Sequence, residues 1–373
     1  MHYAAVLNEY SLAGEIVDNL RATTDASLDV CIEAAKNVAR LIGQYVSDED
    51  FKRIEYALKN YTVNVDDCYD RKLLDQLVIR LDDIFREKEQ LSYSILQDDY
   101  NLIECLRTFS DTVRKTDARI PLAIFSEVDY RWLGQLVALF QMDQSRDVKM
   151  AALSCIDCLA ERCGQSISAF LIDNKLSIVL ANQMPNSGPL NELQLCGLKL
   201  LTRIFSFSLS PPLEHFEYFT SEFFLKLIAL MEFHPREAID LMVNFSAVCS
   251  QIDSDPIIVA LEKDCRPEFS PVFIKMINKG CSVRRLEFFI KITKRGDDLL
   301  HSIFYMNDLK VMTHVVAREL INNESLQVRE LCLSAIEQLV CLGLKDEEMV
   351  EAVASCTLPV PQSLQEQLQI PIR

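Results

Sequence analysis

The stretch Val148-Lys-Met-Ala-Ala-Leu-Ser-Cys-Ile-Asp-Cys-Leu159 returns almost position for position, 180 residues later, as Val328-Arg-Glu-Leu-Cys-Leu-Ser-Ala-Ile-Glu-Gln-Leu339. Similar segments lie between the two, at residues 197–204, 238–245 and 285–292. Equivalent positions follow one another at spacings of 45, 41, 47 and 47 residues. This period is typical of armadillo and HEAT arrays, in which each helical unit is too small to bury its apolar face and therefore stacks on its neighbours. The pattern predicts a binding surface rather than a catalytic cleft.

The composition favours a large helical protein. The 373 residues are 49% apolar and 25% charged, which suffices for a continuous core. Only nine glycines occur, and apolar residues recur at three- and four-residue spacings instead of alternating as in strands. We therefore expect an all-α fold, an armadillo/HEAT-like α-solenoid of stacked helical repeats.

One continuous elongated domain is expected, because no Ser/Gly/Pro-rich linker divides the sequence. It would consist of an N-terminal helical cap over residues 1–98, armadillo-like repeats over 99–358, and a C-terminal tail over 359–373 that leaves the helical body. In the cap, apolar stripes predict helices over residues 27–42 and 70–88, the first ending at Gly43.

The chain begins without the basic start and apolar core of a secretory signal, and its apolar runs are too short to span a membrane. A soluble, cytoplasmic protein without membrane insertion is expected. The thirteen cysteines are spread singly over helix-like segments. In a protein that is not exported, this favours reduced thiols packed as small hydrophobic groups.

The net charge of −17 disfavours binding to nucleic acid or anionic lipid. The charge is uneven, however, because residues 275–295 contain seven basic residues and only one acidic residue, Glu287. This basic segment is a candidate surface for an acidic partner. The alternative is that it forms the solvated polar faces of two helices. The candidate partner-binding residues in this segment are Arg284, Arg285, Lys291, Lys294 and Arg295.

In stacked arrays one helix of each unit lines a concave wall, which can hold a partner helix. Lys199 and Arg203 share one face of a repeat helix and are added to the candidate partner-binding residues. Phe288 and Tyr305 are the expected aromatic anchors near such a groove. The alternative is an exposed helix face without a partner.

Signals for an enzyme are weak. The sequence has no Gly-rich phosphate loop, no Gly-x-Ser-x-Gly elbow and no His-Glu-x-x-His pair. Cys155-x-x-Cys158 with Cys163 comes closest to a metal or thiol motif, but neither a second Cys pair nor a nearby His follows. The five histidines are scattered. We therefore expect no catalytic residues, no cofactor and no metal.

The run Phe304-Tyr-Met-Asn-Asp-Leu-Lys-Val311 opens a predicted helix that reaches Arg318-Glu-Leu320. This stretch resembles the signature of the WISH/DIP/SPIN family, which stands near the end of an armadillo-like domain. The chain is similar to the short fungal form, since helices begin almost at once and neither the SH3 domain nor the proline-rich stretch of animal relatives precedes them. Lys310 joins the candidate partner-binding residues, and Phe304, Leu309 and Val311 are expected in the core.

The resemblance implies a partner and an activity. Members of the family bind the actin-related protein 2/3 (Arp2/3) complex and activate it without a preformed mother filament. The complex then seeds linear actin filaments that prime branched networks at endocytic sites. We accordingly expect a monomer at cytoplasmic cortical actin patches that reaches the filament pointed end only indirectly. The alternative is a generic helical-repeat adaptor that binds a peptide or helix in its concave groove.

Overall fold

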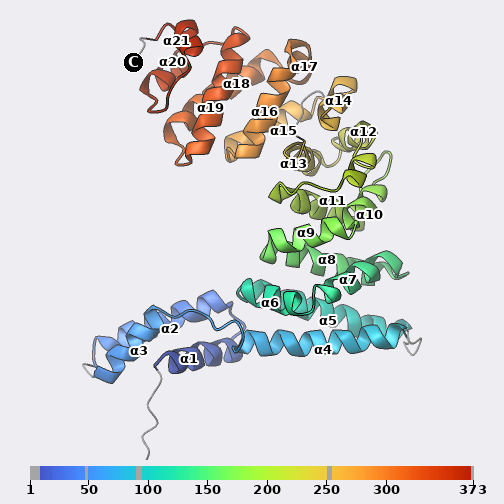
Figure 1. The fold of residues 1–373 in the computed structure, drawn as a ribbon, viewed down its shortest axis with the longest axis vertical. Helices are drawn as coiled ribbons and strands as arrows, with labels where there is room; N and C mark the ends of the chain where they lie inside the picture. The colour runs from blue at the N-terminus through green and yellow to red at the C-terminus, as the bar shows by residue number, and fades with distance from the viewer. Residues whose placement is uncertain (1–8, 47–48, 90–94, 250–253, 371–373) are drawn as a thin grey trace, which may run out of the picture. The chain divides into compact units, whose positions relative to one another are not determined.

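A computed structural model of the chain describes residues 9–46, 49–89, 95–249 and 254–370, and every regular element within these ranges is a helix (Figure 1). The predicted all-α class is confirmed. The chain forms two compact units, residues 1–170 and 171–373. Within the described ranges, no helix combines the length and the apolar character needed to cross a membrane.

The first unit is built from nine described helices, the last of which crosses the boundary at residue 170. They are α1 (Glu9–Thr23), α2 (Leu28–Gly43), α3 (Glu49–Lys59), α4 (Tyr69–Glu89), α5 (Ile95–Lys115), α6 (Arg119–Glu127), α7 (Arg131–Met142), α8 (Arg146–Cys163) and α9 (Gln165–Asp173).

The second unit contains the remaining α-helices and two short 3₁₀ helices, η1 and η2. They are α10 (Leu176–Asn182), α11 (Glu192–Ile204), η1 (Phe205–Phe207), η2 (Leu213–Glu217), α12 (Ser221–Leu230), α13 (Pro235–Ser246), α14 (Pro256–Lys263), α15 (Phe269–Lys279), α16 (Val283–Arg295), α17 (Asp297–Ile303), α18 (Met306–Asn322), α19 (Leu326–Cys341), α20 (Glu347–Ser355) and α21 (Gln362–Leu368).

All five segments of the sequence repeat are helical, in α8, α11, α13, α16 and α19. Their apolar positions are buried, as the three- and four-residue spacing requires. In the second unit α11 packs on α13, α13 on α16, and α16 on α19, so these repeat helices follow one another in a row (Figure 1). The row is the part of the fold that positions the candidate site.

The sequence match between α8 and α19 extends to their N-terminal caps. The Ser145 hydroxyl accepts a hydrogen bond from the Val148 backbone N–H at 3.4 Å, and the Ser145 N–H donates to Asp143 Oδ1 at 2.7 Å. The equivalent Ser325 accepts from the Val328 N–H at 3.4 Å, and its own N–H donates to Asn323 Oδ1 at 3.0 Å. These bonds satisfy backbone donors that have no partner inside the helix. The two helices therefore begin by the same local mechanism.

The helices expected in the cap are present as α2, which ends at Gly43, and α4. The expected start of the repeats, between residues 98 and 99, lies inside α5. The segment after Pro359, which was expected to leave the helical body, instead contains α21. This helix buries Leu364 and Leu368 against α19. Pro361 stands at its N-terminal boundary, where a proline starts a helix without losing a hydrogen bond.

An aromatic cluster forms part of the core of the first unit. Trp132 on α7 is 2% exposed, and its ring centroid lies 4.9 Å from that of Phe109, 5.4 Å from Phe125 and 6.2 Å from Phe85. The four rings come from α4, α5, α6 and α7. Large buried rings contribute strongly to stability, so this cluster ties the four helices into one core.

Candidate functional site

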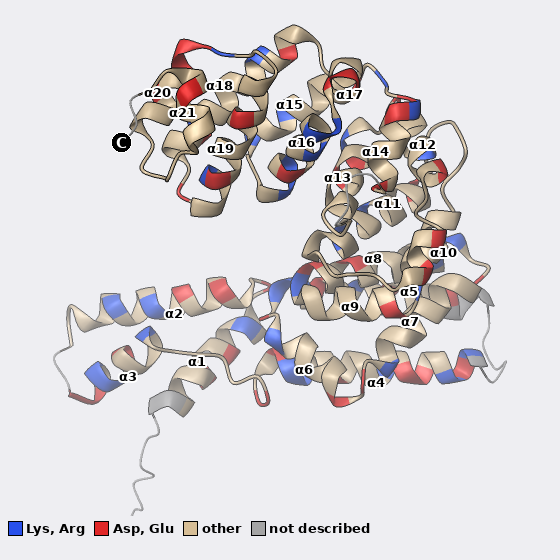
Figure 2. Ribbon diagram, turned by 45° about the horizontal axis from the view of Figure 1, so that its top comes forward, with Lys and Arg blue, Asp and Glu red and all other residues tan. Residues whose placement is uncertain are grey.

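The candidate site is a groove in the second unit, formed by α13, α16, α19 and the turn after α13. Its volume is about 370 Å³. It is lined by Val243, Ser246, Ala247 and Cys249, by Arg284, Glu287, Phe288, Ile290, Lys291 and Lys294, and by Leu331 and Ser334. The structure thus brings together three predicted partner-binding residues, Arg284, Lys291 and Lys294. The basic residues of α16 stand out in Figure 2.

Lys291 is anchored within the protein. Its Nζ donates to the Cys249 carbonyl at 2.7 Å and to the Ser246 carbonyl at 2.5 Å, and it lies 3.1 Å from Asp255 Oδ2. The Asp255 side chain is fully buried, and its Oδ1 accepts from the Ile257 N–H at 3.0 Å to cap α14. A cation at the end of α13 also suits the negative end of that helix. Lys291 therefore joins α13, α14 and α16.

Arg284 bridges α16 to two earlier parts of the second unit. Its Nη1 donates to Asn244 Oδ1 at 2.8 Å and to the Phe205 carbonyl at 3.1 Å, and its Nη2 donates to Ser208 Oγ at 2.8 Å. Burial lowers the pKa of Arg284 from its ordinary value. The guanidinium, with several donors in a fixed plane, suits this set of acceptors better than an ammonium would.

Arg285 and Arg295 also make contacts inside the second unit. Arg285 donates to the Gly280 carbonyl at 2.8 Å and lies 3.4 Å from Asp240 Oδ1. Arg295 Nε donates to Glu262 Oε1 at 2.6 Å. The alternative of purely solvated helix faces is therefore wrong for these two arginines and for Arg284 and Lys291. All four side chains hold helices or turns together.

The remaining candidates are more accessible but do not all share one site. Lys294 is exposed and lines the groove. Lys199 on α11 and Lys310 on α18 are also exposed, and neither lines it. Arg203 on α11 is half-buried. Lys294 is therefore the candidate cation that an incoming partner can reach most directly at the groove.

The family-like run divides into buried and exposed residues. Phe304 is 2% exposed and Leu309 is fully buried, as expected. Val311, which was expected in the core, is instead 42% exposed because it faces away from the neighbours of α18. Tyr305 is 67% exposed and is open to a partner. Phe288, the other expected anchor, is only 1% exposed and belongs to the wall of the groove.

Asp308 performs a structural task in the same run. Its Oδ2 accepts hydrogen bonds from Ser270 Oγ at 2.7 Å and from the Tyr305 N–H at 3.3 Å. The carboxylate thus caps the start of α18 and attaches it to α15. Its role could not be predicted from the sequence, because Ser270 lies 38 residues earlier.

The structure groups no three His, Cys, Asp or Glu side chains for a metal among the described residues. Cys155 and Cys158 are buried. Sequence reasoning missed a buried pair, Ser177 and His215, whose Oγ and Nε2 lie 2.8 Å apart. Both side chains are shielded from solvent, so a substrate does not reach them. Burial is the main cause that lowers the pKa of His215.

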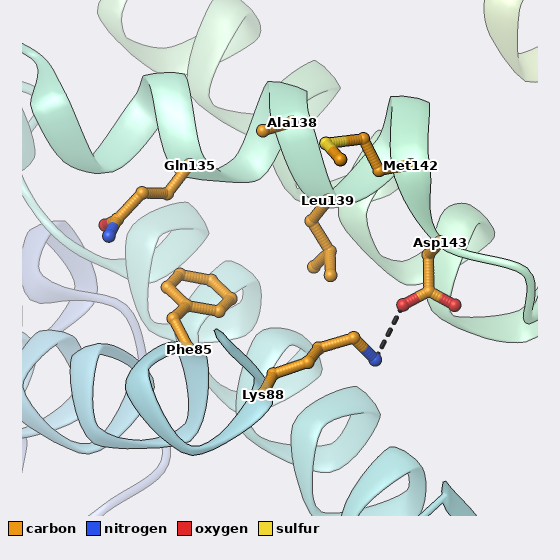
Figure 3. Close-up of a pocket in the computed structure, with 7 residues that line it drawn as sticks. All are labelled: Phe85, Lys88, Gln135, Ala138, Leu139, Met142 and Asp143. Carbon is orange, nitrogen blue, oxygen red and sulfur yellow. Dashed lines mark ion pairs between the residues drawn. The ribbon is translucent and has the colours of Figure 1, made fainter. Parts of the chain in front are cut away.

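A smaller pocket of about 230 Å³ lies in the first unit between α4 and α7 (Figure 3). Its apolar wall includes Phe85, Leu139 and Met142, and Lys88 lies 2.6 Å from Asp143 at one end. The same Asp143 caps α8 through Ser145. Because the polar groups at this end already have a structural role, we do not assign a ligand to the pocket.

Comparison with known proteins adds no assignment: no family model matches the chain, and no curated protein matches its sequence.

Proposed function

We propose that the chain is an armadillo/HEAT-like α-solenoid of the WISH/DIP/SPIN type that binds and activates the Arp2/3 complex. The observation that supports this most is the eight-residue run from Phe304 to Val311 with its sequel at Arg318. The run opens α18, which packs on α19, and α19 lines the groove. The helix that carries the family-like stretch thus packs on a helix that lines the groove.

The exposed residues of the run favour a contact role. Phe304 and Leu309 are accounted for by packing, whereas a tyrosine and a lysine at the exposed positions 305 and 310 are not. Exposed aromatic residues are enriched among the side chains that dominate binding energy. The proposed partner surface therefore includes Tyr305 and Lys310 on α18 in addition to the groove that contains Lys294.

The proposed mechanism is selection of a conformation by a rigid surface. Lys291 and Arg284 fix the walls of the groove, so that its shape is set before a partner arrives. A preorganised surface that binds the nucleation-competent arrangement of the Arp2/3 complex more tightly than the inactive one shifts the equilibrium between them. The change in the free energy of this equilibrium cannot exceed the difference between the binding free energies for the two arrangements. This mode of action needs neither catalysis nor a cofactor, and we propose none.

The test is polymerisation of pyrene-labelled actin with purified Arp2/3 complex, without preformed filaments and without other activators. The expected result is acceleration that depends on the concentration of this chain, with unbranched filaments by microscopy. No acceleration at saturating concentration would exclude the proposal. In cells the tagged chain is expected in cytoplasmic cortical actin patches. A pull-down that returns peptide-bearing cargo and no Arp2/3 subunit would identify the generic adaptor instead.

A further inference from the structure

Two cysteines from different helical segments meet in the second unit. Cys281 lies in the short connection between α15 and α16, and Cys332 lies in the second turn of α19. Their thiols are hydrogen-bonded to each other. Residues 281 and 332 are far apart in the sequence, so this contact is made by the packing of the helices and not by a local motif such as Cys-x-x-Cys.

The end of α18 holds the two cysteine-bearing segments in place. Arg318 on α18 donates to Asn278 Oδ1 at 3.0 Å, in the last turn of α15 before the connection. Arg329 in the first turn of α19 donates to the Leu320 carbonyl of α18 at 2.9 Å. Helix α19 also packs directly on α16 and on α18. The connection and the start of α19 are thus attached to the same end of one helix.

The two thiols differ in their access to solvent. Cys281 is half-buried and stands between the exposed Gly280 and Ser282. Cys332 is fully buried. A solute therefore reaches Cys281 first, and the partial burial of this thiol favours a small reactant over a bulky one.

The surroundings favour the thiolate form of Cys281. The hydrogen bond with Cys332 is the main cause that lowers the pKa of Cys281. The guanidinium groups of Arg318 and Arg285 act in the same direction, while burial and a nearby carboxylate oppose them. The same hydrogen bond raises the pKa of Cys332, so the proton between the two sulfurs stays on Cys332. A half-buried thiolate beside a protonated second thiol is the arrangement found in cysteines that sense oxidants.

We propose that Cys281 and Cys332 are a reversible redox pair, in which a peroxide oxidises Cys281 and Cys332 converts the product to a disulfide. The Cys281 thiolate attacks one oxygen of hydrogen peroxide, the O–O bond breaks, and the released hydroxide takes up a proton to form water. The Cys332 sulfur then attacks the sulfenic acid on Cys281. The S–O bond breaks, the S–S bond forms, and the departing hydroxide leaves as water with the Cys332 proton. The two sulfurs together lose two electrons to one peroxide.

The disulfide would join the connection before α16 to α19, and both helices line the groove. Oxidation would thus fix the spacing of two groove walls at one end. Thiol–disulfide exchange with a dithiol reductant would release them. The pair is reduced at rest, in agreement with the reduced thiols expected from the sequence. The proposal does not depend on the proposed function.

Peptide mapping of the reduced full chain after treatment with hydrogen peroxide tests the proposal. Free thiols are blocked with N-ethylmaleimide before digestion, and trypsin releases the two cysteines in residues 280–284 and 330–345. A linked peptide lighter than the sum of the two by two hydrogen atoms is expected, and dithiothreitol should remove it. Because residues 330–345 also contain Cys341, fragmentation of the linked peptide identifies which cysteine is bonded.

Variants assign the two roles. Cys281→Ala should abolish the linked peptide. Cys332→Ala should also abolish it and leave a sulfenic acid on Cys281 that dimedone captures. Cys265→Ala is the matched control, because Cys265 is likewise half-buried in the second unit but burial raises its pKa to about 12. This control should form the linked peptide at the wild-type yield, and in the wild type Cys281 should be oxidised at least about tenfold faster than Cys265.

The stability of the oxidised chain gives a second readout. A bond between residues 281 and 332 constrains the unfolded chain, so the oxidised protein should unfold at a higher urea concentration than the reduced protein. A lower urea midpoint would show that the bond distorts the native packing and would overturn the proposal. So would oxidation of Cys341 without any linked peptide, or a linked peptide that forms only in urea. Cys281→Ala changes a half-buried position and keeps the test valid if Cys332→Ala does not fold.

Discussion

Lys291 on α16 and Asp255 at the start of α14 form an ion pair with an Nζ–Oδ2 distance of 3.1 Å, and the Asp255 side chain is completely shielded from solvent. The ammonium also donates hydrogen bonds to two backbone carbonyls, so the buried carboxylate is neutralised by a group whose own hydrogen bonds are made. Breaking such a pair costs more than the pair contributes when intact, because an uncompensated charge stays buried. Lys291 is therefore a determinant of stability before it is a candidate for binding.

Lys291→Met tests this role. The substitution keeps most of the side-chain volume and removes the ammonium, which leaves Asp255 buried without its cation. We expect the free energy of unfolding to fall by about 3 kcal/mol, measured by urea titration with far-ultraviolet circular dichroism. Lys294→Met on the same helix is the control, since that side chain is exposed, and should change stability by less than about 0.5 kcal/mol. Equal stabilities for the two variants would contradict a stabilising role of the ion pair between Lys291 and Asp255.

Lys294→Glu tests the groove as a partner surface. We expect the concentration for half-maximal acceleration of actin assembly to rise about tenfold, which corresponds to about 1.4 kcal/mol. Melting should be unchanged, because Lys294 is exposed. Lys59→Glu at an exposed position of α3 carries the same charge change outside the groove and should retain wild-type activation. Equal loss in both variants would point to net charge rather than to the groove.

The buried His215 predicts a dependence of stability on pH. Burial, partly opposed by Glu214 and Asp173, holds the pKa of His215 below its usual 6.5 in the folded chain. Between these two pKa values the unfolded chain binds more protons than the folded one, so stability is lost as the pH falls below about 6.5. The slope from this group is at most about 1.4 kcal/mol per pH unit.

The measurement is urea unfolding between pH 7.5 and 5 for the wild type and for His215→Gln, an uncharged side chain that can still bond Ser177. The variant is expected to lack the contribution of His215 to the dependence of stability on pH, although carboxylates still titrate in both proteins. Parallel curves for the two proteins would show that His215 is not the responsible group.

Thiol reactivity should follow burial. Burial raises the pKa of Cys155 to about 12 and that of Cys158 to about 11, while Cys341 is exposed. Because the thiolate is the reactive form, an aromatic disulfide reagent should label Cys341 first and reach Cys155 and Cys158 only after unfolding. Peptide mass mapping over time measures this order, and Cys341→Ser should remove the fastest phase. Early labelling of Cys155 in the folded chain would refute the assignment.

The helices were largely predictable because helix formation here is governed by local spacing. The match between residues 148–159 and 328–339 predicts α8 and α19, and Gly43 predicts the end of α2. The missed helix α21 had a local signal too. Leu364 and Leu368 are four residues apart just after Pro361, but the proline was interpreted as the end of the helical body rather than as a helix start.

Which basic side chains of residues 275–295 are exposed and which make internal contacts was not predictable, because this depends on partners distant in the sequence. The acceptors of Arg284 include the Phe205 carbonyl, 79 residues earlier, and Lys291 pairs with Asp255, 36 residues earlier. Spacing within α16 identifies a shared face. It cannot distinguish an exposed lysine such as Lys294 from Lys291, whose ammonium bonds acceptors inside the protein. The prediction that Val311 is buried was wrong for a related reason, since the face of α18 that is covered depends on which helices pack beside it.

Trp132 is the one tryptophan of the chain, and it lies in the aromatic cluster of the first unit. Intrinsic tryptophan fluorescence therefore observes residues 1–170 alone, whereas circular dichroism averages over both units. Coincident denaturation curves from the two signals would identify one cooperative transition, and separated curves would identify two. A single indole thus allows the unfolding of the first unit to be followed separately from that of the second in the unlabelled wild-type chain.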